Sequence, residues 1–130
     1  MSGKSYNTTA LAFMGDAIYE VYVRRKVIGT GQPAADKLHL MAVKYVKAES
    51  QAKAIKVLYS SLSEEEQTLT RRARNRKTAT KAKNADPVTY RWATAFEALI
   101  GCLYLAGKIR RMEEIIGLAM DVVDEKADGK

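Results

Sequence analysis

The sequence predicts an all-α protein, and three observations support this prediction. The 130-residue chain contains only two prolines, and 47% of its residues are apolar. Apolar side chains recur at the 3.6-residue spacing of helices along most of the chain. Ala, Leu, Lys and Glu, which favour helices, are frequent. We therefore expect one domain spanning 1–130, with about six to seven helices around a single core.

Residues that favour caps and turns bound each expected helix. Ser63 followed by Glu66 forms a capping box, Asp86 before Pro87 starts another helix, and Gly107 stops that helix. Two further signals are a glycine-rich turn at 29–32 and a change of direction near 47–50. The expected helices lie at about 7–27, 33–46, 48–59, 63–69, 86–106 and 109–123. The last residues, Asp124 to Lys130, are predicted to form a frayed tail.

Composition excludes several classes of protein. With one histidine, His39, and one cysteine, Cys102, the chain cannot supply a structural zinc site or an internal disulfide. No apolar run reaches the roughly 18 residues of a membrane span without a charge, and the N-terminus lacks a signal core. We expect a cytoplasmic protein. Its net charge of +7 favours a polyanionic partner.

Three acids remain unexplained once caps, helix starts and the tail are assigned. Asp16 and Glu20 lie in the apolar stretch 11–23, and Glu97 is the only charge in the apolar stretch 92–105. An ionised carboxylate in an apolar setting costs several kcal/mol unless it has a partner. Asp16 and Glu20 share a helical face, so two alternatives stay open: solvent or arginine contacts, or a carboxylate pair that holds Mg²⁺.

A basic run follows the fourth expected helix, with seven positive charges between Arg71 and Lys83 and no acid. Its second half has no apolar periodicity, which predicts an exposed loop. The run is either a solvated loop or a surface for RNA phosphates and sugar hydroxyls. The candidate RNA-binding residues are Arg71, Arg72, Arg74, Asn75, Arg76, Lys77, Thr78, Lys81 and Lys83. Arg24, Arg25 and Lys26 are weaker candidates.

Two motifs and a stretch between them resemble the ribonuclease III family. Residues 13–17, Phe-Met-Gly-Asp-Ala, resemble the Phe-Leu-Gly-Asp-Ala signature of its catalytic domain. Residues 94–101, Thr-Ala-Phe-Glu-Ala-Leu-Ile-Gly, resemble its second acidic block, and 45–52 is similar to the segment between them. Order and spacing agree from Leu11 to about Leu105. The chain ends where ribonuclease III continues into a double-stranded-RNA-binding domain, which is typical of the Mini-ribonuclease III group.

The resemblance implies a function. It implies a helical, homodimeric, cytoplasmic endoribonuclease that cleaves double-stranded RNA with Mg²⁺ (or Mn²⁺) and trims the ends of 23S ribosomal RNA precursor. Asp16 and Glu97 carry over as the catalytic, metal-holding acids, whereas Glu20 is only a neighbour. The family usually has acids at two further positions, where this chain has Ala12 and Thr94. With fewer carboxylates, water and RNA oxygens would have to complete the metal's coordination.

Two rival interpretations remain. A non-catalytic helical RNA-binding module derived from a nuclease would show the same steep salt dependence of binding, but no Mg²⁺-dependent cleavage. A helical dimer acting only as a protein scaffold would have no affinity for RNA at low salt.

Overall fold

The fold is all-helical, as the sequence predicts. The structure, a computed structural model, describes residues 6–76 and 86–127, and this part of the chain contains no strand. No helix in it is long and apolar enough to span a membrane. The helices are α1 (Thr8–Ile28), α2 (Ala35–Val46), α3 (Ala48–Leu58), α4 (Glu64–Asn75), α5 (Pro87–Leu105) and α6 (Ile109–Ala127), with a 3₁₀ turn, η1 (Tyr59–Ser61), before α4.

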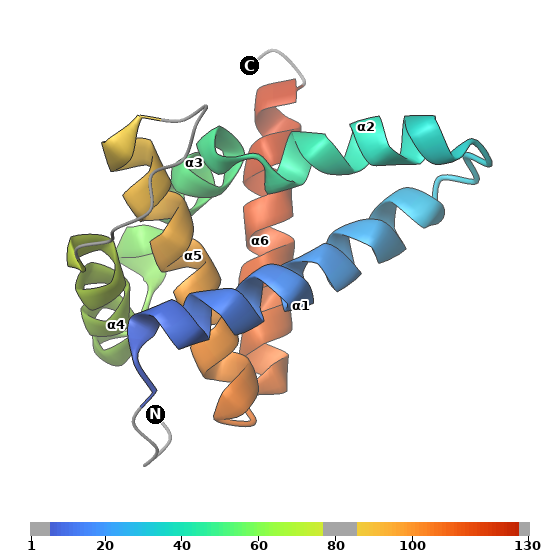
Figure 1. Ribbon diagram of the computed structural model, residues 1–130. Coiled ribbons are helices and arrows are strands. Elements are labelled where there is room, and N and C mark those ends of the chain that lie inside the picture. Colours follow the sequence, from blue (N-terminus) through green and yellow to red (C-terminus); the bar gives the residue numbers. More distant parts are fainter. Residues whose placement is uncertain (1–5, 77–85, 128–130) are drawn as a thin grey trace.

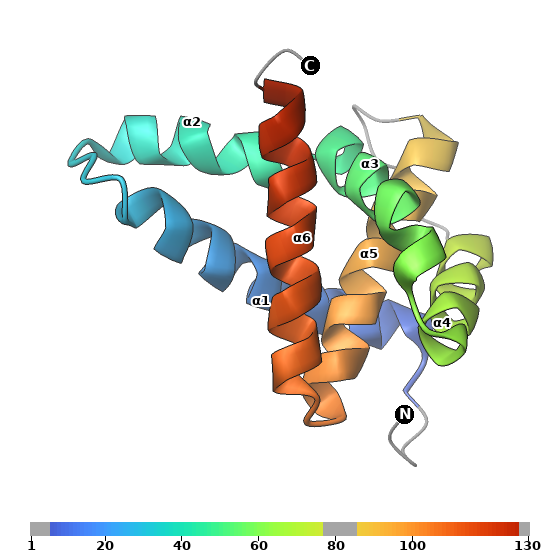
Figure 2. The same cartoon turned by 180° about the vertical axis from the view of Figure 1, so that it is seen from behind.

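Helix α5 is the central helix of the core. Its side chains from Ala95 to Ile100, except Glu97, are fully buried. α1 crosses it on one side, while α3, α4 and α6 pack on the others (Figures 1 and 2). The Tyr19 ring of α1 meets the Phe96 ring of α5 edge to face, with 4.9 Å between centroids. Phe96 and Leu99 are therefore core residues of the single chain.

Two glycines allow α1 and α5 to touch backbone to backbone. A Cβ atom on Gly15 would lie 1.7 Å from the carbonyl oxygen of Glu97, and one on Gly101 would lie 2.0 Å from that of Leu11. No side chain larger than hydrogen fits at either position, because real Cβ atoms do not approach backbone so closely. The crossing point lies within one residue of Asp16 and at Glu97 itself.

Helix α6 fastens the α1–α2 hairpin, which projects from the body of the molecule (Figure 1). Asp124 accepts a 2.6 Å hydrogen bond from the Tyr45 hydroxyl, and Lys44 and Lys26 lie 3.1 and 3.5 Å from its carboxylate. The prediction that the frayed tail begins at Asp124 is therefore wrong. Asp124 has three partners on α1 and α2, and helix α6 continues past it to Ala127. Residues 128–130 lie outside the described part.

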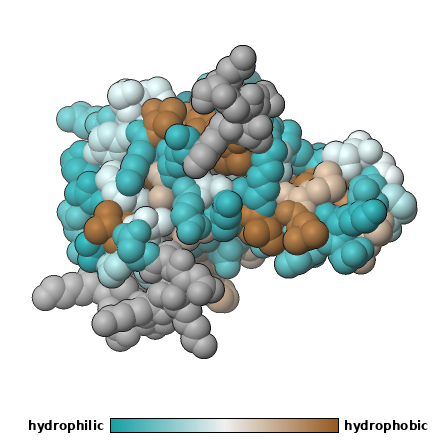
Figure 3. All heavy atoms as spheres, turned by 90° about the horizontal axis from the view of Figure 1, so that it is seen from above, coloured by the Kyte–Doolittle hydropathy of each residue, from teal (hydrophilic) through white to brown (hydrophobic). Residues whose placement is uncertain are grey.

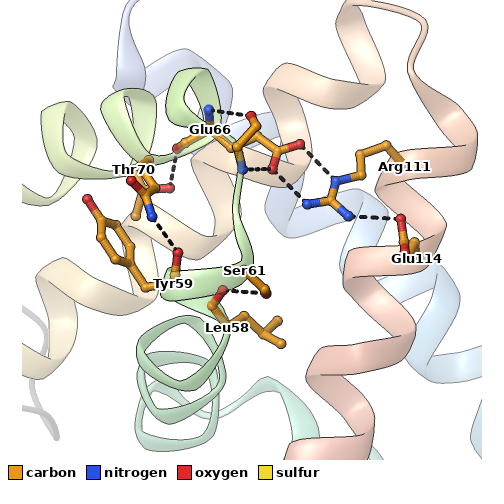
Figure 4. A network of polar contacts seen from close by, with 9 residues as sticks. Leu58, Tyr59, Ser61, Glu66, Thr70, Arg111 and Glu114 are labelled. Carbon is orange, nitrogen blue, oxygen red and sulfur yellow. Dashed lines mark hydrogen bonds and ion pairs between the residues drawn. The ribbon is translucent and has the colours of Figure 1, made fainter.

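A buried ion pair joins α4 to α6 (Figure 4). Glu66 is only 6% exposed and binds Arg111 at 2.8 Å, while Arg111 also binds Glu114 at 2.8 Å. Glu66 completes the predicted capping box with Ser63, so one carboxylate caps α4 and ties it to α6. The sequence analysis found the cap and missed the ion pair, because Arg111 lies 45 residues away.

Most predicted boundaries are confirmed, with local corrections. Asn7 caps α1, Asp86 caps α5 with Pro87 in its first turn, and Gly107 has the positive φ of a helix stop. Pro33 does not enter α2, which starts at Ala35 after an extended residue. On α2, Ala42 and Tyr45 are buried, whereas the other apolar residues of its inner side are half-buried: Leu38, Met41, Val43 and Val46.

Two details differ from the pattern of the sequence. Ile109, which helical spacing puts on the apolar side of the last helix, is 38% exposed because it begins α6 at the surface. The fourth helix continues past its predicted end at 69, so that Arg71, Arg72, Arg74 and Asn75 form the last turns of α4. Their helical conformation follows from buried Leu69, Thr70 and Ala73, which hold this end of α4 against the core.

Gly15→Ala should disrupt the crossing of α1 and α5. The added methyl would clash with the Glu97 backbone, and overpacking of this kind costs about 1–3 kcal/mol or more. Urea unfolding would measure the loss. The control is Gly117→Ala on α6, where a Cβ meets nothing within 4 Å and helix propensity predicts a gain of about 0.5–1 kcal/mol. Equal stabilities for the two variants would contradict the close contact.

Arg111→Met should destabilise the protein by about 2 kcal/mol at neutral pH, because it leaves the Glu66 carboxylate buried without its cation. The Arg111 guanidinium holds the pKa of Glu66 below its usual range. Because the pKa of Glu66 is lower in the folded state than the unfolded value of about 4.3, its ionisation stabilises the fold above that pH. This stabilisation is lost as the pH falls through the folded-state pKa of Glu66. The difference between variant and wild type should therefore shrink in acid.

The measurement is the free energy of unfolding between pH 3 and 7. Arg110→Met is the matched control, since Arg110 is the exposed neighbour of Arg111. A pH-independent difference, or an equal effect of both substitutions, would argue against the pair.

Candidate active site

The crossing of α1 and α5 brings Asp16 and Glu97 together. Asp16 follows Gly15 on α1, and Glu97 supplies the carbonyl that Gly15 approaches. The two side chains share a hydrogen bond between their carboxyl groups. Residues 81 positions apart in the sequence therefore lie in one candidate site, and they are the two acids that the family resemblance carries over.

The electrostatics of this pair are unfavourable without a cation. Glu97 is partly buried, and loss of solvent is the main reason that its pKa rises to about 8. The negative charge of Asp16 and the hydrogen bond with it raise the pKa further. Two carboxylates in contact cannot both ionise at low cost. At neutral pH the isolated pair therefore tends to retain a proton on Glu97.

The pair lies in a pocket of about 250 Å³ between α1, α4 and α5. Such a volume suits a hydrated ion and a phosphate group and lies below the roughly 300–1,000 Å³ of small-molecule sites. Arg76 and Arg91 contribute positive charge to its wall. Ala12 and Thr94, the two positions where the resembled family has acids, also line it. The Thr94 hydroxyl donates to the Tyr90 carbonyl of its own helix.

Gln51 is a site residue that the sequence analysis missed. Its side chain, on α3, is 3% exposed and donates to the Val46 carbonyl at 2.9 Å, and its polar interaction with Glu97 lowers the pKa of that carboxyl group. Its Oε1 atom is buried and has no hydrogen-bond partner among residues 6–76 and 86–127. An unsatisfied buried carbonyl costs about 1–3 kcal/mol. Gln51 is one of several polar residues on α3, so its residue type did not mark it as a site residue. The signal that could have found it is its place in the stretch 45–52, which resembles the family.

Glu20 does not join the pair. Its carboxylate binds Arg24 at 3.1 Å one turn further along α1, and it lines a separate pocket between α1 and α2 together with His39. Of the alternatives that the spacing left open, the structure thus favours arginine pairing for Glu20 and contact with Glu97 for Asp16.

The first residues of the basic run, from Arg71 to Arg76, lie beside the pocket. Arg76 lines the pocket itself, and Arg71, Arg72 and Asn75 are exposed on the last turns of α4. Lys77, Thr78, Lys81 and Lys83 lie outside the described residues. Arg24 and Lys26, the weaker candidates on α1, have carboxylate partners in Glu20 and Asp124.

The donor set fits a hard divalent cation. Asp16 and Glu97 offer carboxylate oxygens, the ligands that Mg²⁺ and Mn²⁺ prefer, and a cation between them would relieve the repulsion that raises the pKa of Glu97. Within residues 6–76 and 86–127, no third His, Cys, Asp or Glu completes a metal-binding cluster. Water and substrate oxygens would therefore have to supply the remaining ligands.

Glu97→Gln should stabilise the metal-free protein at alkaline pH. A folded-state pKa of about 8, raised from 4.5, means that folding stability is lost as pH rises between these values. The amide cannot ionise. The free energy of unfolding of the variant should therefore exceed that of the wild type by about 2 kcal/mol at pH 9, and the two values should be closer at pH 5. Urea unfolding in EDTA measures this, with Glu20→Gln as control. Parallel pH profiles for wild type and Glu97→Gln would contradict the raised pKa.

Comparisons with known proteins agree with this geometry. A family model described as the ribonuclease III domain matches residues 9–108. The chain is 45% identical to Mini-ribonuclease 3 of Thermoanaerobacter sp. (strain X514), over 93% of this chain and 85% of that protein. It is 47% identical to Mini-ribonuclease 3 of Brevibacillus brevis, over 91% and 88%.

A solved structure shares the fold as well. A protein of Fusobacterium nucleatum, determined by X-ray crystallography, superposes with a TM-score of 0.81 at 31% identity and covers 91% of this chain and 94% of that one. Sequence and structure therefore place this chain in the ribonuclease III family of endoribonucleases, where its relatives are Mini-ribonuclease 3 proteins.

Proposed function

We propose that this endoribonuclease cleaves double-stranded RNA and that Asp16 and Glu97 hold the divalent cation, Mg²⁺ or Mn²⁺, that the reaction needs. The observation that carries the proposal is the contact between these two carboxyl groups in a pocket bordered by arginines. Without a bound cation, two ionised carboxylates in contact repel each other, and this repulsion costs free energy. That cost is expected where a cation is the functional partner.

The roles of the protein groups follow from their positions. When bound, a divalent cation lowers the pKa of a water molecule and offsets negative charge that develops on the phosphate. Asp16 and Glu97 would supply the carboxylate oxygens that hold the cation, and Glu97 must release its proton before the pair can do so. The polar interaction of Gln51 with Glu97 lowers the pKa of Glu97 and so favours its ionised form. Arg76 and Arg91 can bind the phosphates on either side of the scissile bond.

The distribution of ion pairs supports RNA binding along the end of α4. Arg24, Lys26, Lys44 and Arg111 have carboxylate partners on α1, α4 and α6. In the described part of the chain, none of Arg71, Arg72, Arg74 and Arg76 has one. Positive charge without acid partners beside the pocket is suited to phosphates. We assign the RNA backbone to these arginines and Asn75, continuing into Lys77, Thr78, Lys81 and Lys83.

A homodimer is part of the proposal. Large apolar side chains are exposed on the first two helices of the monomer: Phe13 is 81% exposed, Leu40 69% and Ile28 62%. Figure 3 shows apolar patches among the polar surface toward the α1–α2 end. Exposed apolar surface of this kind is typical of protein interfaces. Phe13 also borders the pocket, so a partner chain would sit beside the site.

The natural substrate and location are proposed from the family resemblance. Trimming of 23S ribosomal RNA precursor in the cytoplasm would place this enzyme in ribosome biogenesis. One alternative retains support: with Ala12 and Thr94 in the pocket wall, the site has two acids where the family usually has four, as a non-catalytic RNA-binding module would.

Asp16→Asn decides between the two. In the enzyme, the substitution weakens cation binding and should reduce cleavage of a long RNA duplex in Mg²⁺ by at least about 100-fold, corresponding to several kcal/mol of barrier. Binding of the duplex in EDTA and the melting temperature should change little, because Asp16 is exposed. Glu20→Gln is the matched control and should retain cleavage. Full activity of Asp16→Asn would overturn the assignment, and absence of cleavage by the wild type would favour the binding module.

A further inference from the structure

The Trp92 side chain holds two cations from two other helices. The guanidinium carbon of Arg74, on α4, lies 4.9 Å from the centre of the Trp92 ring, and the Lys56 ammonium, on α3, lies 5.7 Å from it. Tyr59 meets the same ring edge to face at 6.3 Å. One half-buried aromatic residue of α5 thus positions charges from α3 and α4.

A third cation extends this arrangement. Arg71, one turn before Arg74 on α4, donates a 2.6 Å hydrogen bond to the Tyr59 hydroxyl. We call these five residues, Lys56, Tyr59, Arg71, Arg74 and Trp92, the Trp92 patch. Its rings restrict three long side chains that would otherwise be free in solution. Restricting them in advance lowers the entropy lost when they bind a ligand.

The three cations of the patch keep their full charge. An aromatic ring or a hydroxyl attracts a cation without neutralising it, unlike a carboxylate. Within residues 6–76 and 86–127, no carboxylate lies within ion-pair distance of Lys56, Arg71 or Arg74. Elsewhere in the described chain, acids pair with Arg24, Lys26, Lys44 and Arg111. A set of positioned, uncompensated charges favours an anionic partner.

The patch adjoins the pocket. Arg74 follows Ala73 on α4, and Trp92 follows Arg91 on α5; both preceding residues line the pocket wall. A guanidinium stacked on a ring can still offer its N–H groups to a phosphate. The Nε–H of Arg74 donates to Asn75 Oδ1 at 2.9 Å, so a phosphate would bind its two terminal NH₂ groups. The indole is already contacted by Arg74, Lys56 and Tyr59, so stacking an unpaired base on it would displace one of them.

We propose that the Trp92 patch is a second contact surface for the phosphate backbone of duplex RNA, outside the cleavage pocket. The inference rests on the proposed function and adds Lys56, which lies on α3 and outside the basic run, and the aromatic support of Tyr59 and Trp92. Lys56 and Arg74 bind phosphates directly, and Trp92 is a positioning residue that holds them.

The test measures binding of a 30-base-pair RNA duplex in EDTA, where no cleavage occurs, over a range of salt concentrations. Lys56→Gln should weaken binding several-fold at low salt and reduce the slope of log K against log salt by about one, the value for one lost phosphate contact. Lys37→Gln, at an exposed position of α2, is the matched control and should change neither quantity. Trp92→Phe, which keeps a weaker cation–π partner, should weaken binding less than Trp92→Leu.

Each outcome decides a different point. Identical slopes for Lys56→Gln and Lys37→Gln, while Arg76→Gln still weakens binding, would overturn the patch and leave the proposed function standing. Loss of single-stranded RNA binding in Trp92→Leu without a change in duplex binding would overturn it in favour of base stacking. If the wild type does not bind the duplex, the proposed function fails as well. Should Trp92→Leu fail to fold, Lys56→Gln and Trp92→Phe still decide the question.

Discussion

The contact between the backbones of α1 and α5 is the constraint on which the candidate site depends. Gly15 and Gly101 remove the side chains that would keep these helices apart, and the carbonyls of Glu97 and Leu11 occupy the space. Because Asp16 follows Gly15 and Glu97 lies at the crossing, the same packing that closes the core also forces two acids into contact. Burial of the α5 side chains from Ala95 to Ile100 supplies the hydrophobic free energy that opposes their repulsion.

Cations in the described part of the chain have different partners in different places. On α1, α2 and α6, several cations pair with acids, as Asp124 with Lys44 and Glu66 with Arg111 show. At the end of α4 and along its border with α3 and α5, arginines and Lys56 have aromatic or hydroxyl partners instead. The matched charges stabilise the fold, and the unmatched ones remain available to a polyanion beside the pocket.

The helices and most of their caps could be predicted from the sequence, because periodicity and capping are local. Asp16, Glu20 and Glu97 stood out as acids in apolar stretches, and the family resemblance selected Asp16 and Glu97 among them as candidates. Contacts between distant residues could not be predicted in this way. Nothing local indicated that Glu66 meets Arg111, that Asp124 belongs to a packed helix, or that Gln51 reaches Glu97. Spacing alone paired Asp16 with Glu20, whereas the fold pairs it with Glu97 and leaves Glu20 to Arg24.

The central claim is that one crossing of two helices builds one cation site from Asp16 and Glu97. Its most direct test is a crystal soaked in Mn²⁺ and measured at a wavelength where manganese scatters anomalously. The account predicts an anomalous peak with carboxylate oxygens of both residues within about 2.5 Å. A peak held by other residues, or none between Asp16 and Glu97 at saturating Mn²⁺, would contradict it.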